Sequence, residues 1–212
     1  MQIIVRQMNE FDIEDLLIIE KEAFFPLTIG TSFNIQLKNK YSKYMVAEKS
    51  YVKPIENSNH LLFKKTIKLC ANLFGIIPLW LIKSPSPARE VLGYVGVWFQ
   101  GDEAHISEIA VKVSYRGTGI GELLLISAMR VAINNGSLQM GLEARISNII
   151  AQRLYEKYGF ELNGVRKRYY SDNREDAVIM TTAMIHSKEY QAKFIALQER
   201  YLESGKSINI IL

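Results

Sequence analysis

The stretch at residues 115–125, YRGTGIGELLL, decides the fold. Its three glycines stand within five residues, after an arginine and before an apolar run. A strand pattern, HISEIAVKV (105–113), precedes the stretch, and a helical pattern follows at 121–134. Where a strand turns into a helix, unpaired N–H groups converge and the helix dipole adds about half a positive charge. The stretch therefore predicts an anion-binding turn, in which glycine lets the backbone approach a phosphate closely.

Two common phosphate-binding motifs do not fit this turn. It lacks the Gly-Lys-Ser/Thr ending that supplies the lysine and the magnesium ligand of a nucleotide hydrolase. It also lacks the third glycine of the dinucleotide fingerprint G-x-G-x-x-G, because Leu124 stands at that position after Gly119 and Gly121. Taken alone, the stretch is compatible with an anion site or with a purely structural turn.

Regular elements are predicted along the rest of the chain as well. Apolar alternation indicates strands at 3–6, 44–48, 91–99, 138–144, 160–170 and 177–185. Helical spacing and capping residues indicate helices at 9–24, 149–158 and 188–202. This order predicts a mixed α/β (α+β) domain whose second half runs βαβαββ.

Residues 51–89 form an excursion between two predicted strands. Its apolar stretch, LCANLFGIIPLWLI (69–82), is too short to cross a membrane, which takes about 20 residues. We expect an inserted helical flap packed on the domain, with an interfacial or partner-docking helix as the alternative.

The composition restricts the function. The 212 residues are 48% hydrophobic and 23% charged, as in a soluble globular domain. The net charge of +4 suits an anionic ligand without indicating nucleic-acid binding, because a modest excess of lysine is usually a solvated surface. Cys70 is the single cysteine and the three histidines are dispersed, so we expect neither a disulfide framework nor a metal site. No signal peptide is recognisable at the N-terminus, and a cytoplasmic location is expected.

Several motifs together resemble one enzyme family. Residues 116–121, RGTGIG, resemble the R/Q-x-x-G-x-G/A loop with which GNAT acetyltransferases hold the pyrophosphate of coenzyme A. The motifs LEARISN, QRLYEKYGF and RYYSDNREDAVIM resemble the RimI-type branch, which acetylates the N-terminal alanine of a ribosomal protein. The resemblance covers about 3–48 and 91–185. It implies the GNAT fold, a mixed central sheet flanked by helices. We expect an acetyltransferase domain at 1–185, in which the flap at 51–89 is an insertion, and a C-terminal helical extension at 186–212.

The resemblance implies a role in binding acetyl-CoA for three groups of residues. Main-chain groups that pair with the pantetheine arm are expected at Ile109, Ala110 and Val111. The pyrophosphate is expected to lie on Arg116, Gly117, Thr118, Gly119, Ile120, Gly121 and Glu122. Near the thioester, the cofactor is expected to touch Asn148.

The resemblance also implies two catalytic residues, Glu143 as the general base and Tyr155 as the acid that protonates the departing thiolate. A free α-amine has a pKa of about 7.7 to 8.0 and a lysine about 10.4, so an N-terminal amine is the easier substrate for a carboxylate base. Each residue has a structural alternative, an outward-facing strand carboxylate for Glu143 and a core tyrosine for Tyr155. Glu108 is the rival base, because other GNAT branches take their carboxylate from that strand, and its alternative is a solvated strand residue.

Other polar residues near these motifs receive weaker interpretations. His105 is interpreted as a surface strand histidine. Residues 166–168, RKR, are interpreted as a solvated strand end, with contact to phosphate or RNA as the alternative. Four hairpin residues could orient a substrate or only form a turn: Tyr169, Tyr170, Glu175 and Asp176.

Three hypotheses for the function follow. The first is a protein N-terminal acetyltransferase whose acceptor is a protein N-terminus, in particular a ribosomal protein. The second is a GNAT enzyme that acetylates lysine or a small amine, and the third is a non-catalytic acetyl-CoA-binding or partner-docking module. The run FFPLT (24–28) lacks the tryptophan that RimI-type chains carry there, and the excursion and the terminal helix are additions. These departures bear on the acceptor more than on the cofactor, and the oligomeric state is left open.

Overall fold

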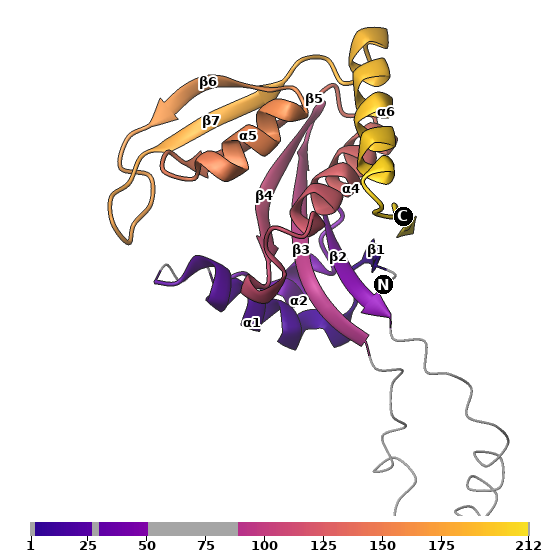
Figure 1. The fold of residues 1–212 in the computed structure, drawn as a ribbon. Helices are drawn as coiled ribbons and strands as arrows, with labels where there is room; N and C mark the ends of the chain where they lie inside the picture. Colours follow the sequence, from indigo (N-terminus) through magenta and orange to yellow (C-terminus); the bar gives the residue numbers. More distant parts are fainter. Residues whose placement is uncertain (1–2, 27–29, 51–88, 212) are drawn as a thin grey trace, which may run out of the picture. The chain divides into compact units, whose positions relative to one another are not determined.

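The computed structural model describes residues 3–26, 30–50 and 89–211. The described elements follow one another as β1 (Ile3–Gln7), α1 (Ile13–Phe24), α2 (Phe33–Gln36), β2 (Ser42–Ser50), β3 (Arg89–Gln100), β4 (Glu103–Val111), α4 (Ile120–Asn134), β5 (Gln139–Arg145), α5 (Ile149–Lys157), β6 (Phe160–Arg166), β7 (Ala177–Thr182), α6 (Lys188–Glu203) and β8 (Ile210–Ile211). Figure 1 shows their arrangement. Of the flap expected at 51–89, residues 51–88 lie outside the described part of the chain.

All eight described strands form one sheet, in the order β6-β7-β5-β4-β3-β2-β1-β8. The β4–β5 and β1–β8 pairs are parallel. The pairs β1–β2, β3–β4, β5–β7 and β6–β7 are antiparallel. The mixed central sheet flanked by helices is the fold class that the sequence predicted. The short strand β8 was not predicted.

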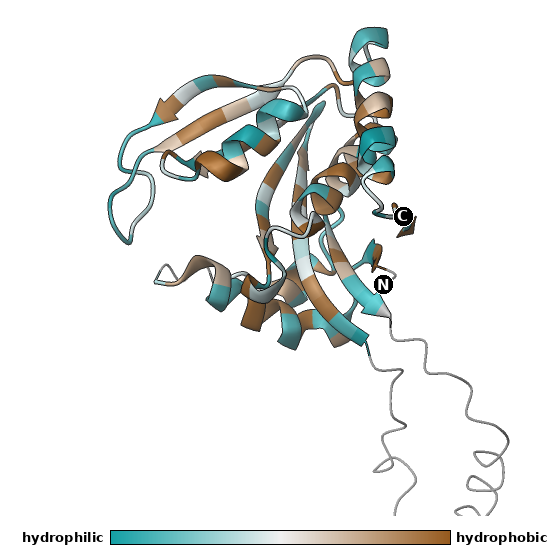
Figure 2. Cartoon of the chain, viewed as in Figure 1, coloured by the Kyte–Doolittle hydropathy of each residue, from teal (hydrophilic) through white to brown (hydrophobic). Residues whose placement is uncertain are grey.

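Two layers of helices bury the two faces of the sheet. The first core joins α4, α5 and α6 to the sheet, and the second joins α1 and α2 to its other face through Leu16, Ile19 and Phe33. Helix α4 is apolar around most of its circumference, which is expected of a helix covered on several sides. Figure 2 shows this as brown along α4, while the turn between β6 and β7 is teal.

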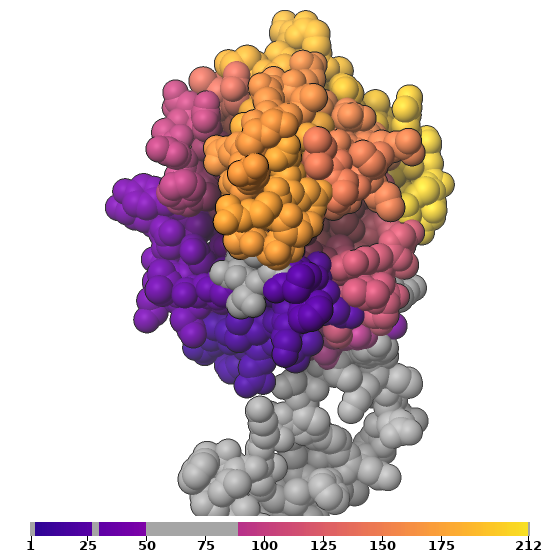
Figure 3. Space-filling model, turned by 90° about the vertical axis from the view of Figure 1, so that its left-hand side faces the viewer, coloured from indigo at the N-terminus to yellow at the C-terminus, as the bar shows by residue number. Residues whose placement is uncertain are grey.

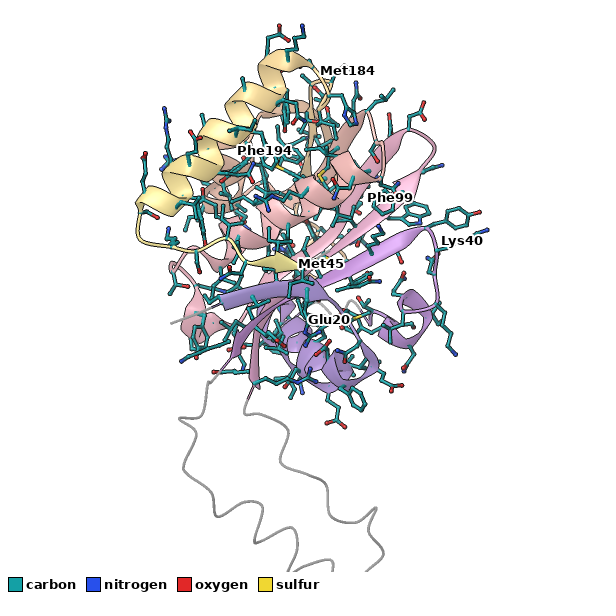
Figure 4. The ribbon with its side chains drawn as sticks, turned by 90° about the vertical axis from the view of Figure 1, so that its right-hand side faces the viewer. Glu20, Lys40, Met45, Phe99, Met184 and Phe194 are labelled. Atoms are coloured by element: carbon teal, nitrogen blue, oxygen red, sulfur yellow. The ribbon has the colours of Figure 1, made fainter. Side chains whose placement is uncertain are left out.

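The C-terminal residues are packed into the first core. Tyr190, Phe194, Leu197 and Tyr201 form the buried face of α6, as the helical spacing predicted. The Tyr190 hydroxyl donates to the carbonyl of Tyr158 at 2.7 Å, and the Phe194 and Tyr158 rings lie 6.3 Å apart. In Figure 4, Phe194 on α6 and Glu20 on α1 mark the two helical layers. Beyond α6 the chain returns to the sheet edge, where β8 pairs with β1.

Candidate active site

The central strands β4 and β5 separate along their length. They pair in parallel from Glu103 with Gln139 to Ile106 with Leu142, and no later pair is formed between them. Ser107 is an extra residue in β4, because the register against β3 shifts between Gly96 and Val97. Beyond this bulge, the edge of β4 that faces β5 is left without a strand partner. An extended ligand can add to such an edge by main-chain hydrogen bonds.

The predicted pantetheine residues occupy this open part of β4. Ala110 is buried in the second core, while Ile109 and Val111 pack against the first. Their side chains therefore point to the two faces of the sheet, and their main chain lies along the opening. This is the placement that pairing with an extended ligand requires.

The glycine loop ends at the N-terminus of α4. Gly117 and Gly119 have φ of +75° and +92°, a region that residues with a Cβ rarely adopt, and Gly119 caps the helix. The first hydrogen bond of α4 is donated by the Leu123 N–H to the Gly119 carbonyl at 3.0 Å. The N–H groups of Ile120, Gly121 and Glu122 precede it and have no acceptor within the helix. The loop is therefore built to receive an anion.

The side chains of the loop strengthen this conclusion. The Thr118 hydroxyl donates to the Tyr115 carbonyl at 2.6 Å and holds the turn, and Arg116 is exposed at its start. The Glu122 carboxylate is directed toward α5, where it accepts from Lys157 Nζ at 2.5 Å and from the Tyr158 hydroxyl at 2.8 Å. Its negative charge is thus balanced by Lys157. Glu122 can serve the loop through its main-chain N–H.

The carboxylate of Glu143 contacts two side chains, those of His105 and Arg166. Its Oε2 accepts from His105 Nε2 at 2.7 Å, and its Oε1 lies 3.2 Å from Arg166 Nη2 on β6. The hydrogen bond from His105 and the charge of Arg166 lower the pKa of Glu143. The carboxyl group is therefore ionised at neutral pH. Its side chain is only 11% exposed, so it is not the outward-facing carboxylate that was the alternative.

His105 was expected to be a surface strand histidine, and its hydrogen bond with Glu143 was not predicted. His105 is opposite Gly141 in the parallel pair, two residues before Glu143. Residues two apart on a strand point to the same face, so His105 and Glu143 share that face. The register between β4 and β5, which the sequence does not specify, is what joins them.

A pocket of about 410 Å³ opens over this pair. Its lining includes Trp98, His105, Glu143, Arg166, Tyr169 and Thr181. Two of these residues belong to β6 and the turn after it. Figure 3 shows the hairpin formed by β6 and β7 in orange, directly above the N-terminal helical residues in indigo. The pocket therefore brings Glu143 within reach of a molecule that enters beside the hairpin.

Tyr155 lies in α5, and Asn148 caps the start of that helix. The Tyr155 side chain is 5% exposed, its ring lies 5.8 Å from that of Phe160, and burial raises the pKa of its hydroxyl. The hydroxyl therefore stays protonated at neutral pH. Asn148 caps α5 by accepting from the Ala151 N–H at 3.2 Å and remains exposed. Among the described residues, no hydrogen bond joins Tyr155 to Glu143.

Glu108, the rival base, lies in a separate pocket of about 370 Å³. Its carboxyl group accepts from the Tyr44 hydroxyl and from Thr31 Oγ1, the latter at 3.1 Å. Burial raises the pKa of Glu108, and burial also raises that of Tyr44. Glu108 is thus not a solvated strand residue. The two carboxylates have pKa shifts of opposite sign, because the hydrogen bond from His105 dominates at Glu143, whereas loss of solvent on burial dominates at Glu108.

The turn between β6 and β7 is tied to the end of β5. Arg145 pairs with Asp172 at 2.8 Å and with Glu175 at 3.0 Å, and its guanidinium lies 3.9 Å from the ring centre of Tyr170. Glu175 also accepts from the Ser147 N–H at 2.9 Å, just before α5. These contacts fix the hairpin beside the pocket.

The strand end at residues 166–168 is engaged within the chain. Lys167 pairs with Asp176 at 2.7 Å, and the Arg168 N–H donates to the same carboxylate at 2.8 Å. Together with the pairing of Arg166 and Glu143, these contacts assign the segment to the hairpin.

Glu175→Gln is expected to raise the KM for an acceptor peptide by about tenfold, because a loosened hairpin misplaces the acceptor. Hydrogen bonding from Ser147 lowers the pKa of Glu175 from 4.5 to about 2. The contacts of the Glu175 carboxylate with Ser147 and Arg145 are therefore fully formed above pH 4.5 and are lost as the pH falls toward 2. The measurement is KM for peptide and for acetyl-CoA at neutral pH. Glu161→Gln, on the exposed side of β6, is the control. An unchanged peptide KM would contradict the role of the hairpin.

Comparison with known proteins agrees with this geometry. Residues 67–160 match the acetyltransferase (GNAT) family. A Bacillus subtilis protein named "Putative [ribosomal protein bS18]-alanine N-acetyltransferase" is 34% identical over 177 residues, which are 83% of this chain and 92% of that protein. The chain belongs to the GNAT acetyltransferase family. It is an acetyl-CoA-dependent N-acetyltransferase of the RimI type.

Solved structures of GNAT acetyltransferases share the fold. The crystal structure of the ribosomal-protein-S18-alanine N-acetyltransferase from Escherichia coli has a TM-score of 0.62 at 20% identity, covering 89% of this chain and 97% of that one. A GNAT acetyltransferase from Elizabethkingia anophelis with acetyl-CoA bound has a TM-score of 0.54 at 17% identity, covering 86% and 98%. Membership of the acetyltransferase (GNAT) family, and not the likeness of fold, confirms the predicted cosubstrate, acetyl-CoA.

Within residues 3–26, 30–50 and 89–211, no three His, Cys, Asp or Glu side chains are grouped as metal ligands. In these ranges, no helix combines the length and the apolar character that crossing a bilayer requires.

Proposed function

We propose that this GNAT enzyme acetylates the N-terminal α-amine of a protein, in particular the N-terminal alanine of ribosomal protein bS18. The observation that carries the proposal is the likeness to the Bacillus subtilis protein, which is 34% identical and extends over 92% of that protein. Acetyl-CoA, when bound, supplies the activated acetyl thioester. The residues of this chain hold it, receive the amine and move the protons.

Glu143 is the base in this proposal. Its lowered pKa makes it a weak base that is nevertheless always ionised near neutral pH. Removing the proton from a lysine costs about 3.5 kcal/mol more than removing it from an α-amine, because their pKa values differ by about 2.6 units. A weak carboxylate base therefore favours an N-terminal acceptor over a lysine side chain.

Tyr155 is the acid and Asn148 a cofactor contact in this proposal. A buried hydroxyl of raised pKa holds its proton at neutral pH and can give it to a thiolate. Asn148 lies at the start of the same helix, and its amide N–H₂ can still donate while its oxygen caps α5. In this proposal, helix α5 and its cap supply both side chains to the bound thioester.

Glu108 is the second candidate for the base. Its raised pKa would make it the stronger base of the two. Three hydroxyl groups, those of Tyr44, Thr31 and Ser107, donate hydrogen bonds to it and use three of its about four lone-pair sites. We therefore place Glu143 first and keep Glu108 as the alternative.

Incubation of the enzyme with acetyl-CoA and a set of acceptors tests the choice of acceptor. We expect mass spectrometry to show one acetyl group on a peptide that begins with the N-terminal residues of bS18, alanine first. The same peptide with a blocked N-terminus and a free lysine should gain none, and neither should spermidine. Acetylation of lysine or of the polyamine, with none on any N-terminus, would contradict the proposal.

A further inference from the structure

A lysine from the C-terminal segment lies on the cofactor loop. A Cβ placed on Gly119 would be 2.7 Å from Cε and 2.8 Å from Nζ of Lys206. The Tyr201 hydroxyl donates to the carbonyl of the same glycine at 3.3 Å. Lys206 follows α6, far along the chain from the loop, so its position is a product of the tertiary fold.

The segment around Lys206 is fixed on both sides. Before it, Tyr201 is buried and belongs to the first core. After it, the Val5 N–H donates to the Asn209 carbonyl at 2.7 Å, and β8 pairs with β1. Ile208 and Ile210 also pack against the core. A side chain held between two anchored segments loses little further freedom when it contacts a ligand.

The ammonium of Lys206 has no carboxylate partner in the described part of the chain. Its recorded interaction is with the Tyr201 ring, whose centre lies 5.0 Å from Nζ. The carboxylate in the first turn of α4, Glu122, is bound to Lys157 and Tyr158 instead. An ammonium and several helix N-terminal N–H groups therefore lie at the same glycine, and none of the described residues supplies an anion to balance them.

We propose that Lys206 is a cofactor-binding residue whose ammonium contacts the pyrophosphate of coenzyme A. Lysine binds phosphate as a point charge, which suits a side chain that reaches the loop from a separate segment. The C-terminal segment then completes the anion site that residues 116–122 begin. This inference rests on the acetyl-CoA dependence of the enzyme and is independent of the acceptor, because binding of the cofactor alone can test it.

Titration calorimetry of Lys206→Met with coenzyme A tests the contact. We expect Kd to rise about tenfold, since a charge-assisted hydrogen bond to phosphate is lost. Dephospho-coenzyme A keeps the pyrophosphate and lacks the 3′-phosphate, so it should lose the same factor. The Kd of the wild type should also rise more steeply with salt than that of the variant. Lys206→Arg should stay within about threefold of the wild type.

Acetyl transfer from S-acetylpantetheine, which lacks the pyrophosphate, separates the contact from a structural effect. Lys206→Met should lower kcat/KM with acetyl-CoA and leave it unchanged with S-acetylpantetheine. Lys188→Met, on the exposed start of α6, is the matched control and should change neither. An unchanged Kd for coenzyme A, or an equal loss with both donors, would overturn the proposal. A loss confined to coenzyme A and absent with dephospho-coenzyme A would overturn the assignment to the pyrophosphate.

Discussion

Glu143→Gln is expected to lower kcat by about 1,000-fold, within the range of general base catalysis, and to leave the Kd for acetyl-CoA unchanged. Glutamine keeps the shape of the side chain and can still accept from His105, but it cannot take a proton from the amine. The measurement is the initial rate with an alanine-first peptide and acetyl-CoA. Glu103→Gln, an exposed carboxylate that lines the same pocket, is the control and should change kcat little.

The pH dependence of kcat/KM provides a second test of Glu143 as the base. Because the pKa of Glu143 is lowered, its carboxylate stays ionised as the pH falls below the usual range of a glutamate. The acid limb of kcat/KM should therefore follow protonation of the acceptor α-amine, near pH 7.7 to 8.0. Wild-type turnover in Glu143→Gln would reject this base, and Glu108→Gln would then be the informative variant.

Gly119→Ala is expected to raise the Kd for acetyl-CoA roughly 100-fold, because it strains the cap of α4 and displaces Lys206 at the same time. The φ of +92° is unfavourable for alanine, and its Cβ would collide with the Lys206 side chain at 2.7 Å. A shifted loop no longer directs its N–H groups at one point. Calorimetry with acetyl-CoA measures the effect.

Gly101→Ala is the matched control for this variant. Gly101 also has a positive φ, +58°, but it lies in the turn between β3 and β4 and a Cβ there meets nothing within 4 Å. Both variants should lose a similar amount of conformational stability, of order 1 kcal/mol. Only Gly119→Ala should lose cofactor affinity. Equal affinities in the two variants would show that the loop tolerates the change.

The elements of the fold could be predicted because their signals are local. The patterns that predict the glycine loop, the apolar helix after it and the buried face of α6 each lie within fewer than twenty adjacent residues. β8 could not be predicted in this way, since two isoleucines near the C-terminus form a strand only because β1 offers a free edge. Pairing between the two ends of a chain leaves no local periodicity.

The sequence motifs name candidate site residues, but they do not predict which side chains those residues contact in the fold. Glu143 was named through its motif, but its contacts with His105 and Arg166 depend on which strands neighbour β5 and in what register. The same is true of Lys206, which meets Gly119 only after α6 has packed against α4. The pKa shift of Glu108 could not be predicted from the sequence either, because its direction is determined by the burial of this residue beside Thr31 and Tyr44.

The ion pair between Arg166 and Glu143 has a consequence for how an acceptor arrives. A protonated N-terminus that reaches Glu143 can replace the guanidinium, so one cation is exchanged for another and the carboxylate is never left without a counter-charge. An N-terminally blocked peptide brings no such cation and would have to displace Arg166 without compensation. If the acceptor is a protein N-terminus, its arrival at Glu143 would therefore release Arg166 on β6 from the carboxylate.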